Sequence, residues 1–225
     1  MIGFVVAMEK EAKLFLKEAK INKEQEIAGK KVYFGEFEDK EFVLIIGGIG
    51  KVNAGMSTQI LIDRFNVSRI INFGTAGGKN PEKQHVGDVA LIDKACQFDF
   101  DLSEIDEVDV GYMQDFDLTY FETSYQKYTG GKFVISSLGT GDRFTFKDWA
   151  LQDQIKLGTE VIDMEGGAVA QVAYANSVDC YVLKVLTDVE GSGEESIFGQ
   201  YYNNVQEVCT LIPKALKELI LNIQD

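Results

Sequence analysis

The chain has 225 residues, 45% of them hydrophobic, and its 36 acidic residues outnumber its 22 lysines and arginines to give a formal net charge of −14. This length and composition suit a globular protein with a sizeable core, and we expect one domain over residues 1–225. The acidic balance argues against nucleic acids and anionic membranes as partners, because like charges repel. It does not exclude small ligands that carry no phosphate group.

Cysteine placement and apolar segments indicate the cellular location. Cys96, Cys180 and Cys209 show no C-x-x-C spacing and lie in or beside apolar stretches. We therefore expect buried free thiols, as in a reducing cytoplasm. No apolar stretch approaches the roughly 20 residues of a membrane span, and the first residues lack the basic region of a signal peptide. These features predict a cytoplasmic protein without a membrane anchor.

Apolar periodicity predicts strands and helices in alternation along the chain. We expect strands at residues 2–7, 31–38, 41–46, 69–73, 88–96 and 132–138, helices at 9–18, 54–65, 118–128 and 206–223, and an acidic loop at 102–117. Residues 161–191 add a strand, a helix and a strand. This alternation is typical of the α/β class with a largely parallel sheet covered on both faces.

The strand–helix–strand segment places an acid where each strand is expected to stop. The first strand runs into Asp163, Met164 and Glu165, and the second runs into Thr187 and Asp188. Ligands of open α/β sheets bind outside the carboxyl ends of the strands. Two acids delivered there by neighbouring strands indicate a reaction centre.

Five glycine-containing loops follow predicted strands. They are GGIGKVNAG (47–55), INFGTAGG (71–78), SLGTGDRF (137–144), DMEGG (163–167) and TDVEG (187–191). Glycine lets a backbone approach a ligand closely, although tight turns also use it. None of the five matches the dinucleotide-binding or phosphate-loop signature. Their shared place after strands favours a common ligand site.

Carboxylates are the best candidates for chemistry. Glu165 lies between small apolar neighbours, where a buried charge needs partners, whereas Asp188 has the alternative of capping a following turn. Taken alone, Glu11 is typical of a solvated first helical turn. The single histidine, His85, stands in a polar loop, so we expect a solvated side chain. One histidine and scattered cysteines predict no transition-metal site.

With these residues in view, the chain resembles the nucleoside phosphorylase and nucleosidase superfamily, and within it the 5′-methylthioadenosine/S-adenosylhomocysteine nucleosidases. The resemblance covers nearly the whole chain and follows the family's order and spacing. It is carried by IGFVVAMEKEA, GGIGKVNAG, INFGTAGG, VGDVALID, SLGTGDRF, VIDMEGGAVAQVA and LTDVEG. It implies a three-layer α/β/α fold with a central mixed, largely parallel sheet.

The resemblance also implies an activity and the roles of individual residues. Adenine would be released from 5′-methylthioadenosine, S-adenosylhomocysteine or 5′-deoxyadenosine by hydrolysis, in the context of methionine salvage and without a cofactor. Glu11 would activate the attacking water, Asp188 would protonate N7 of adenine, and Glu165 would hold the ribose hydroxyls. Substrate-binding positions would be Met8, Ile49, Thr75, Ala76, Gly77, Phe144, Thr145, Met164, Lys184, Thr187 and Phe198. Leu102 and Ile105 would reach a neighbouring subunit's pocket, which implies a homodimer.

The residues that separate hydrolases from phosphorylases, and two departures from the nucleosidase pattern, bear on the activity. Phosphorylases of the superfamily carry arginines for phosphate in the N-terminal loop and two residues before the G-T/S-x-G loop. Here the first loop is AMEKEAK and the second position is Asn72, which favours water over phosphate as nucleophile. Lys184 replaces a frequent arginine and loses its fork geometry. Gly166 and Gly167 replace larger small residues, and we expect a looser helix start there.

Two other functions remain open from the sequence. One is a futalosine hydrolase or another purine nucleosidase or phosphorylase of the same superfamily. A 5′ group with a carboxylate would need a cationic pocket, and none is evident in the sequence. The other is a relative that binds nucleosides without catalysis, for which Glu11 would not be needed.

Overall fold

The computed structural model describes residues 1–144, 156–192 and 196–224. The strands are β1 (Ile2–Val6), β2 (Lys20–Ile27), β3 (Lys30–Phe37), β4 (Lys40–Ile46), β5 (Arg69–Gly78), β6 (Val89–Gln97), β7 (Phe121–Glu122), β8 (Val134–Thr140), β9 (Val161–Asp163) and β10 (Asp179–Val189). The helices are α1 (Glu9–Glu18), α2 (Lys51–Phe65), α3 (Ser103–Asp106), α5 (Gly166–Ala175), α6 (Ile197–Val208) and α7 (Ile212–Leu221).

The strands form one mixed sheet that is built around β5. In parallel, β5 pairs with β1 and β10, and β1 pairs with β4. An antiparallel ladder continues from β4 to β3 and β2. On the other side, β10 pairs with β6, β6 with β8, β8 with β9, and β9 returns to β5. Five strands therefore close into a ring, and the ends of β5, β9 and β10 are held together there.

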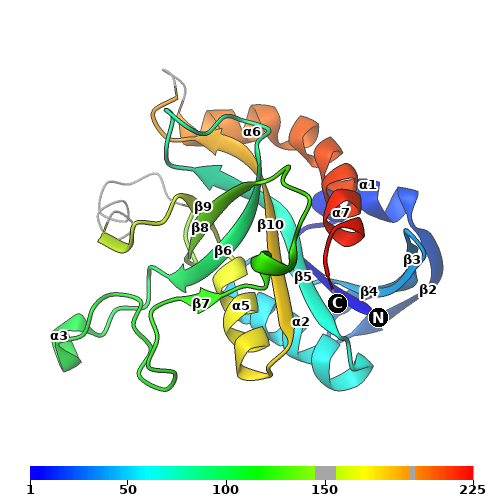
Figure 1. Ribbon diagram of the computed structural model, residues 1–225, viewed down its shortest axis with the longest axis horizontal. Coiled ribbons are helices and arrows are strands. Elements are labelled where there is room, and N and C mark those ends of the chain that lie inside the picture. The colour runs from blue at the N-terminus through cyan, green and yellow to red at the C-terminus, as the bar shows by residue number, and fades with distance from the viewer. Residues whose placement is uncertain (145–155, 193–195, 225) are drawn as a thin grey trace.

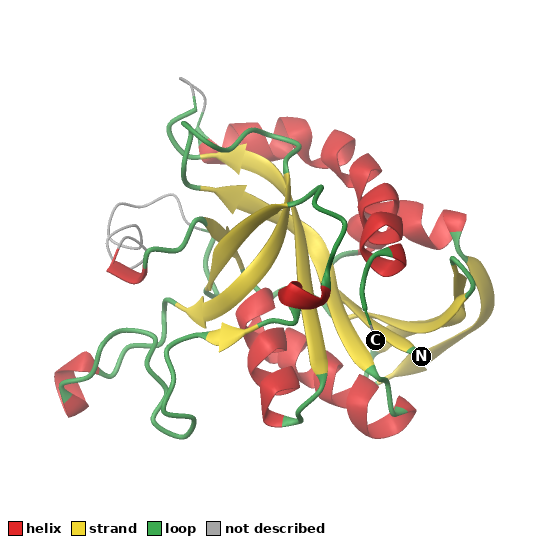
Figure 2. Ribbon diagram, viewed as in Figure 1, coloured by secondary structure: helices red, strands yellow, loops and turns green. Residues whose placement is uncertain are grey.

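Helices cover both faces of the sheet (Figures 1 and 2). On one side lie α2 and α5, and on the other lie α1, α6 and α7. Neighbouring residues of a strand point to opposite faces. Phe4 accordingly belongs to the apolar cluster with Phe15 of α1, whereas Val5 belongs to the cluster with Leu61 of α2 and Val169 of α5. The predicted three-layer α/β/α class is confirmed.

The structure differs from the predicted elements in three places. Residues 118–128 form the short strand β7 and a 3₁₀ turn (Tyr125–Lys127) instead of a helix. Phe121 is fully buried there and pairs with Ala95 of β6, and aromatic residues favour a pleated, half-buried surface. The polar strand β2 was not predicted, because its residues are mostly exposed and show no apolar alternation.

The predicted C-terminal helix is two helices. A 3₁₀ turn at Cys209–Leu211 separates α6 from α7, and Pro213 stands in the first turn of α7. Proline is tolerated there because the first amides of a helix lack internal partners. None of the helices in the described ranges is long and apolar enough to cross a membrane.

Candidate active site

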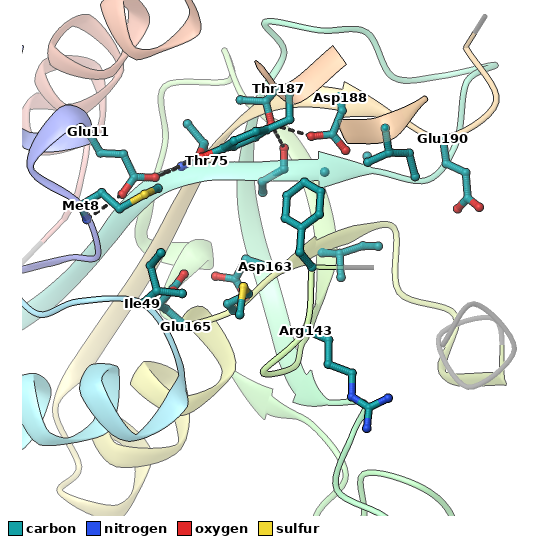
Figure 3. A pocket seen from close by; sticks show the side chains of 18 residues that line it. Met8, Glu11, Ile49, Thr75, Arg143, Asp163, Glu165, Thr187, Asp188 and Glu190 are labelled. Carbon is teal, nitrogen blue, oxygen red and sulfur yellow. Dashed lines mark hydrogen bonds between the residues drawn. The ribbon is translucent and has the colours of Figure 1, made fainter. Parts of the chain in front are cut away.

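A pocket opens at the carboxyl ends of the central strands (Figure 3). All five glycine-containing segments contribute to its wall, although residues 71–78 lie within β5 and not after it. The lining residues are Met8, Glu11, Ile49, Thr75, Ala76, Gly77, Gly78, Arg143, Phe144, Ile162, Asp163, Met164, Glu165, Thr187, Asp188, Glu190, Ile197 and Tyr201. Four of their carboxylates, those of Glu11, Asp163, Glu165 and Asp188, are almost fully buried.

Glu11 is held by donors from β5 and from the loop before α1. One carboxylate oxygen accepts hydrogen bonds from the backbone N–H of Thr75 at 2.7 Å and from its hydroxyl at 2.9 Å, and the other accepts from the N–H of Met8 at 3.1 Å. Gly74 makes room, since a Cβ there would lie 2.8 Å from the carboxylate. Burial raises the pKa of Glu11, whereas these hydrogen bonds and the charge of Lys184 lower it and only partly offset the effect of burial. The local interpretation as a solvated helix residue was wrong, because Glu11 is only 2% exposed.

Glu165 stands at the N-cap of α5, directly after β9. Its carboxylate accepts a hydrogen bond of 3.0 Å from the N–H of Gly50, in the loop after β4. Burial and the neighbouring charge of Asp163 raise the pKa of Glu165 to about 7, and the charge of Lys184 opposes them. Asp163 and Lys184 therefore act on Glu165 in opposite directions.

Asp188 lies inside β10 and not after it. The pairing of β10 with β5 skips a residue between Leu186 and Asp188, and such a bulge re-aims a side chain. The carboxylate accepts a hydrogen bond of 2.6 Å from the hydroxyl of Thr187, and a Cβ at Gly77 would lie 2.7 Å from it. Burial raises the pKa of Asp188 to about 6 despite the Thr187 bond. These contacts explain the position of the Asp188 side chain without a role as a helix cap.

Lys184 supplies a buried positive charge beside these acids. Its ammonium forms an ion pair of 2.8 Å with Asp163, and both side chains are almost completely buried. Burial alone would lower the pKa of Lys184, but the charges of Asp163, Glu165 and Glu11 outweigh it and raise the pKa. Sequence reasoning did not assign Asp163, although its place at the end of a buried strand was a usable signal.

Most of the other predicted positions also meet at this pocket. Met8, Ile49, Thr75, Ala76, Gly77, Phe144, Met164 and Thr187 line it. Phe198 is 58% exposed and packs its ring against Phe144 with 6.4 Å between centroids, while Ile197 and Tyr201 of the same helix reach the pocket. Thr145 lies outside the described residues.

Two predicted positions lie elsewhere in this chain. Leu102 borders a second cavity with Gln97, Phe100 and Met113, and Ile105 is 76% exposed on α3. Figure 1 shows α3 projecting far from the body of the sheet. His85 is exposed in its loop, as predicted, with Asp88 at 3.6 Å.

Sequence reasoning missed seven lining residues. Gly78 and Ile162 belong to strand ends and Glu190 follows β10, so their neighbours in the sequence could have indicated them. Tyr201 sits on α6, in the part of the helix that precedes the predicted start at residue 206. They are Gly78, Arg143, Ile162, Asp163, Glu190, Ile197 and Tyr201.

The three-layer α/β/α fold has its buried carboxylates at the carboxyl edge of the sheet. Comparison with known families identifies the class of protein to which this arrangement belongs. The family model described as "Phosphorylase superfamily" matches residues 1–222, so the chain belongs to that superfamily. The 5′-methylthioadenosine/S-adenosylhomocysteine nucleosidase of Marinomonas sp. (strain MWYL1) is 32% identical over 223 residues, which cover 94% of this chain and 96% of that protein. Within the superfamily, the chain is thus a member of the 5′-methylthioadenosine/S-adenosylhomocysteine nucleosidase family.

Solved structures agree with this placement. The nucleosidase of the same name from S. pneumoniae, determined with the transition-state inhibitor MT-ImmA, superposes with a TM-score of 0.85 at 25% identity over 97% of each chain. Futalosine hydrolase of Helicobacter pylori strain 26695 superposes with a TM-score of 0.87 at 23% identity, over 97% of this chain and 96% of that one. The second likeness concerns the fold alone.

Proposed function

We propose that this chain hydrolyses the N-glycosidic bond of 5′-methylthioadenosine, S-adenosylhomocysteine or both, with 5′-deoxyadenosine as a third substrate to test. The products are adenine and the 5′-substituted ribose. The observation that carries the proposal is the convergence of three buried carboxylates, Glu11, Glu165 and Asp188, on one pocket from separate segments. Family membership supports the same activity.

The three carboxylates suit the charges that develop as the bond breaks. Cleavage puts positive charge on the ribose and negative charge on the departing adenine. Asp188, whose pKa is raised to about 6, is proposed to carry the proton for N7 of adenine. Glu165 is proposed to bind the ribose hydroxyls, where its charge favours the cationic sugar.

Glu11 is proposed to deprotonate the attacking water. Figure 3 supports this division of roles, because Glu11 and Asp188 approach the pocket from opposite sides. An acid and a base on the two sides of a glycosidic bond, with space for a water, is the arrangement of inverting hydrolysis.

Water is favoured over phosphate by the charges around Glu11. A phosphate dianion beside three carboxylates would be repelled without cations to hold it. Asn72 is buried and donates its side-chain amide to the carbonyl of Val5, and Lys184 is already paired with Asp163. The guanidinium of Arg143 points away from Glu11 in Figure 3.

The remaining positions are proposed to select the substrate. Phe144 and Thr145 would bind adenine, and Met164 would pack on the sugar among Thr75, Ala76, Gly77 and Thr187. Met8, Ile49 and Phe198 would surround the 5′ group. Ile49 and Phe198 are 50% and 58% exposed, which supports a covering partner. We propose that Leu102 and Ile105 of a second copy cover them in a homodimer.

A cytoplasmic location and a single domain over residues 1–225 complete the proposal. The three cysteines are free and buried, which supports a reducing compartment. Helices from both halves of the chain cover one continuous sheet, which supports one folding unit.

Adenine release tests the proposed reaction. The purified chain, dialysed free of phosphate, is mixed separately with each of the three adenine nucleosides and with futalosine, and free base is measured. We expect adenine from one or more of the adenine nucleosides, with no increase when phosphate is added. Strict dependence on phosphate would make the chain a phosphorylase, and release from futalosine alone would make it a futalosine hydrolase. Binding without release of any base would indicate a non-catalytic relative.

A further inference from the structure

The carboxylate of Asp163 is the centre of a buried network behind Glu165. One of its oxygens pairs with the ammonium of Lys184 at 2.8 Å and accepts the N–H of Gly166 at 2.7 Å. The other accepts the hydroxyl of Thr140, whose oxygen in turn accepts the N–H of Gly167 at 2.7 Å. The Asp163 side chain is only 1% exposed. Both of its oxygens are therefore occupied within the protein and are not free for a ligand.

The glycine pair at the start of α5 makes this network possible. A Cβ on Gly166 would lie 2.4 Å from Leu138 and 3.0 Å from the Asp163 carboxylate. A Cβ on Gly167 would lie 2.9 Å from both the carbonyl of Cys96 and the Cβ of Thr140. The expectation of a looser helix start was therefore wrong. The two glycines let the start of α5 approach Asp163 and Thr140 closely. The N–H of Gly166 then donates to Asp163, and the N–H of Gly167 donates to Thr140.

Glu165 is bracketed by this network. Asp163 lies two residues before it and Gly166 directly after it, so the hydrogen bond between the Asp163 carboxylate and the Gly166 N–H spans the backbone of Glu165. The ammonium of Lys184 faces the same site, and its charge acts on Glu165 and on Glu11. One carboxylate thus controls both the orientation of Glu165 and the place of the buried cation.

We infer that Asp163 is a positioning residue of the proposed hydrolysis, which holds Lys184 and the start of α5 so that Glu165 and Glu11 meet the substrate in the productive geometry. This inference rests on the proposed function. A buried ion pair by itself is weak evidence for stability, because burying two charges costs about what their attraction returns. The network is therefore better explained by the site that it orients.

The test separates orientation from stability with four variants. Asp163→Asn removes the charge but keeps the size, and Lys184→Met removes the partner. The double variant Asp163→Asn/Lys184→Met removes both buried charges. Asp179→Asn is the control, because it breaks a 2.5 Å ion pair with Lys127 at the start of β10, the strand that also carries Lys184. Thermal unfolding, kcat, KM and the pH profile of adenine release are measured for each.

We expect Asp163→Asn to lower kcat by about 10- to 100-fold, as a misplaced catalytic group does, with a smaller change in KM. The acid limb of the pH profile of adenine release should move to lower pH in this variant. Burial and the charge of Asp163 both raise the pKa of Glu165, so removing the Asp163 charge should lower that pKa, although burial continues to raise it. The double variant should regain thermal stability over Asp163→Asn and remain slow. The control should match the natural chain in kcat and in pH profile.

Other results overturn the inference. If the double variant recovers kcat together with stability, or if Asp163→Asn leaves kcat and the pH profile unchanged, Asp163 has a structural role only. If Asp163→Asn does not fold, Thr140→Val removes just one hydroxyl from the network. Thr140→Val should then lower kcat, and Thr140→Ser, which keeps the hydroxyl, should restore it. If kcat of Thr140→Val equals that of the unmodified chain, the inference is overturned. A natural chain that releases no adenine overturns the proposed function, and the inference with it.

Discussion

At the scale of single residues, the pocket sets three carboxylates in different surroundings. Glu11 accepts three hydrogen bonds, Glu165 accepts one from Gly50 and lies beside a buried cation, and Asp188 accepts one from its neighbour Thr187. Burial raises the pKa of each, and the different partners oppose that rise to different degrees. Groups of one chemical type can therefore take different roles in the same pocket.

Replacing Glu11 with glutamine tests its role as the base. Glu11→Gln keeps the size of the side chain but cannot accept a proton, so kcat should fall by about 100- to 10,000-fold while an adenine nucleoside still binds. Turnover and binding are measured separately, by adenine release and by calorimetry. Glu9→Gln is the control, since Glu9 is exposed on the same helical turn and pairs with Lys31. Unchanged turnover in Glu11→Gln would remove Glu11 from the mechanism.

The raised pKa of Asp188 predicts how stability changes with pH. Folded Asp188 binds its proton up to about pH 6, whereas the unfolded chain releases it near 3.8. Its contribution to stability is therefore complete below pH 3.8 and is lost as the pH rises through about 6. Asp188→Asn should remove up to about 3 kcal/mol of this pH dependence.

Urea unfolding at a series of pH values measures that change. The free energy of unfolding of Asp188→Asn should increase relative to the natural chain as the pH rises across this window. The exposed Asp63→Asn on α2 serves as the control and should follow the natural chain. Parallel curves for Asp188→Asn and the natural chain would show that burial of Asp188 costs the folded protein nothing.

At the scale of elements, the pairing of β5 with β10 shapes the space around Asp188. Gly77 of β5 lies opposite Asp188 at the bulge, and a Cβ there would lie 2.7 Å from the carboxylate. Gly77→Ala should displace the carboxylate and lower kcat by about 10- to 100-fold while the protein stays folded. Circular dichroism and adenine release check the two halves of this prediction.

Gly55→Ala is the matched control for that substitution. Gly55 lies inside α2, where an added Cβ would meet Val172 at an ordinary contact distance of 3.6 Å. Alanine is favoured over glycine in a helix, so this variant should gain about 0.5–1 kcal/mol of stability with normal turnover. A slow Gly55→Ala variant would mean that the effect of Gly77→Ala is not local to Asp188.

Elements with local signals were predictable from the sequence, and contacts between distant segments were not. The strand–helix–strand unit at residues 161–191 shows its apolar pattern within 31 residues, so Glu165 and Asp188 could be recognised there. Glu11 is buried only because Thr75, 64 residues away, folds over it. The break between α6 and α7 was hidden because the apolar face continues through Pro213.

At the scale of the whole molecule, the proposed homodimer predicts that apolar residues around α3 hold two copies of the chain together. Leu102→Asp and Ile105→Asp should lower association, because a charge in an apolar interface is desolvated without a partner. Sedimentation should show monomers, and KM for 5′-methylthioadenosine should rise more than kcat falls. Leu221→Asp, exposed on α7, is the control. A dimer that survives both changes with unaltered KM would place the partner contact elsewhere.

The ring of strands has a consequence for the order in which the protein is made. Arg69 of β5 pairs with Asp179 of β10, about 110 residues later in the chain. While the chain is being synthesised, the first two-thirds can form α1 and the N-terminal ladder and can pair β1 with β5, but β9 and β10, the other partner strands of β5, do not yet exist. Glu11 and Asp188 are therefore brought into one site only after nearly all of the chain has emerged. We therefore expect the growing chain to be inactive until β10 has been made.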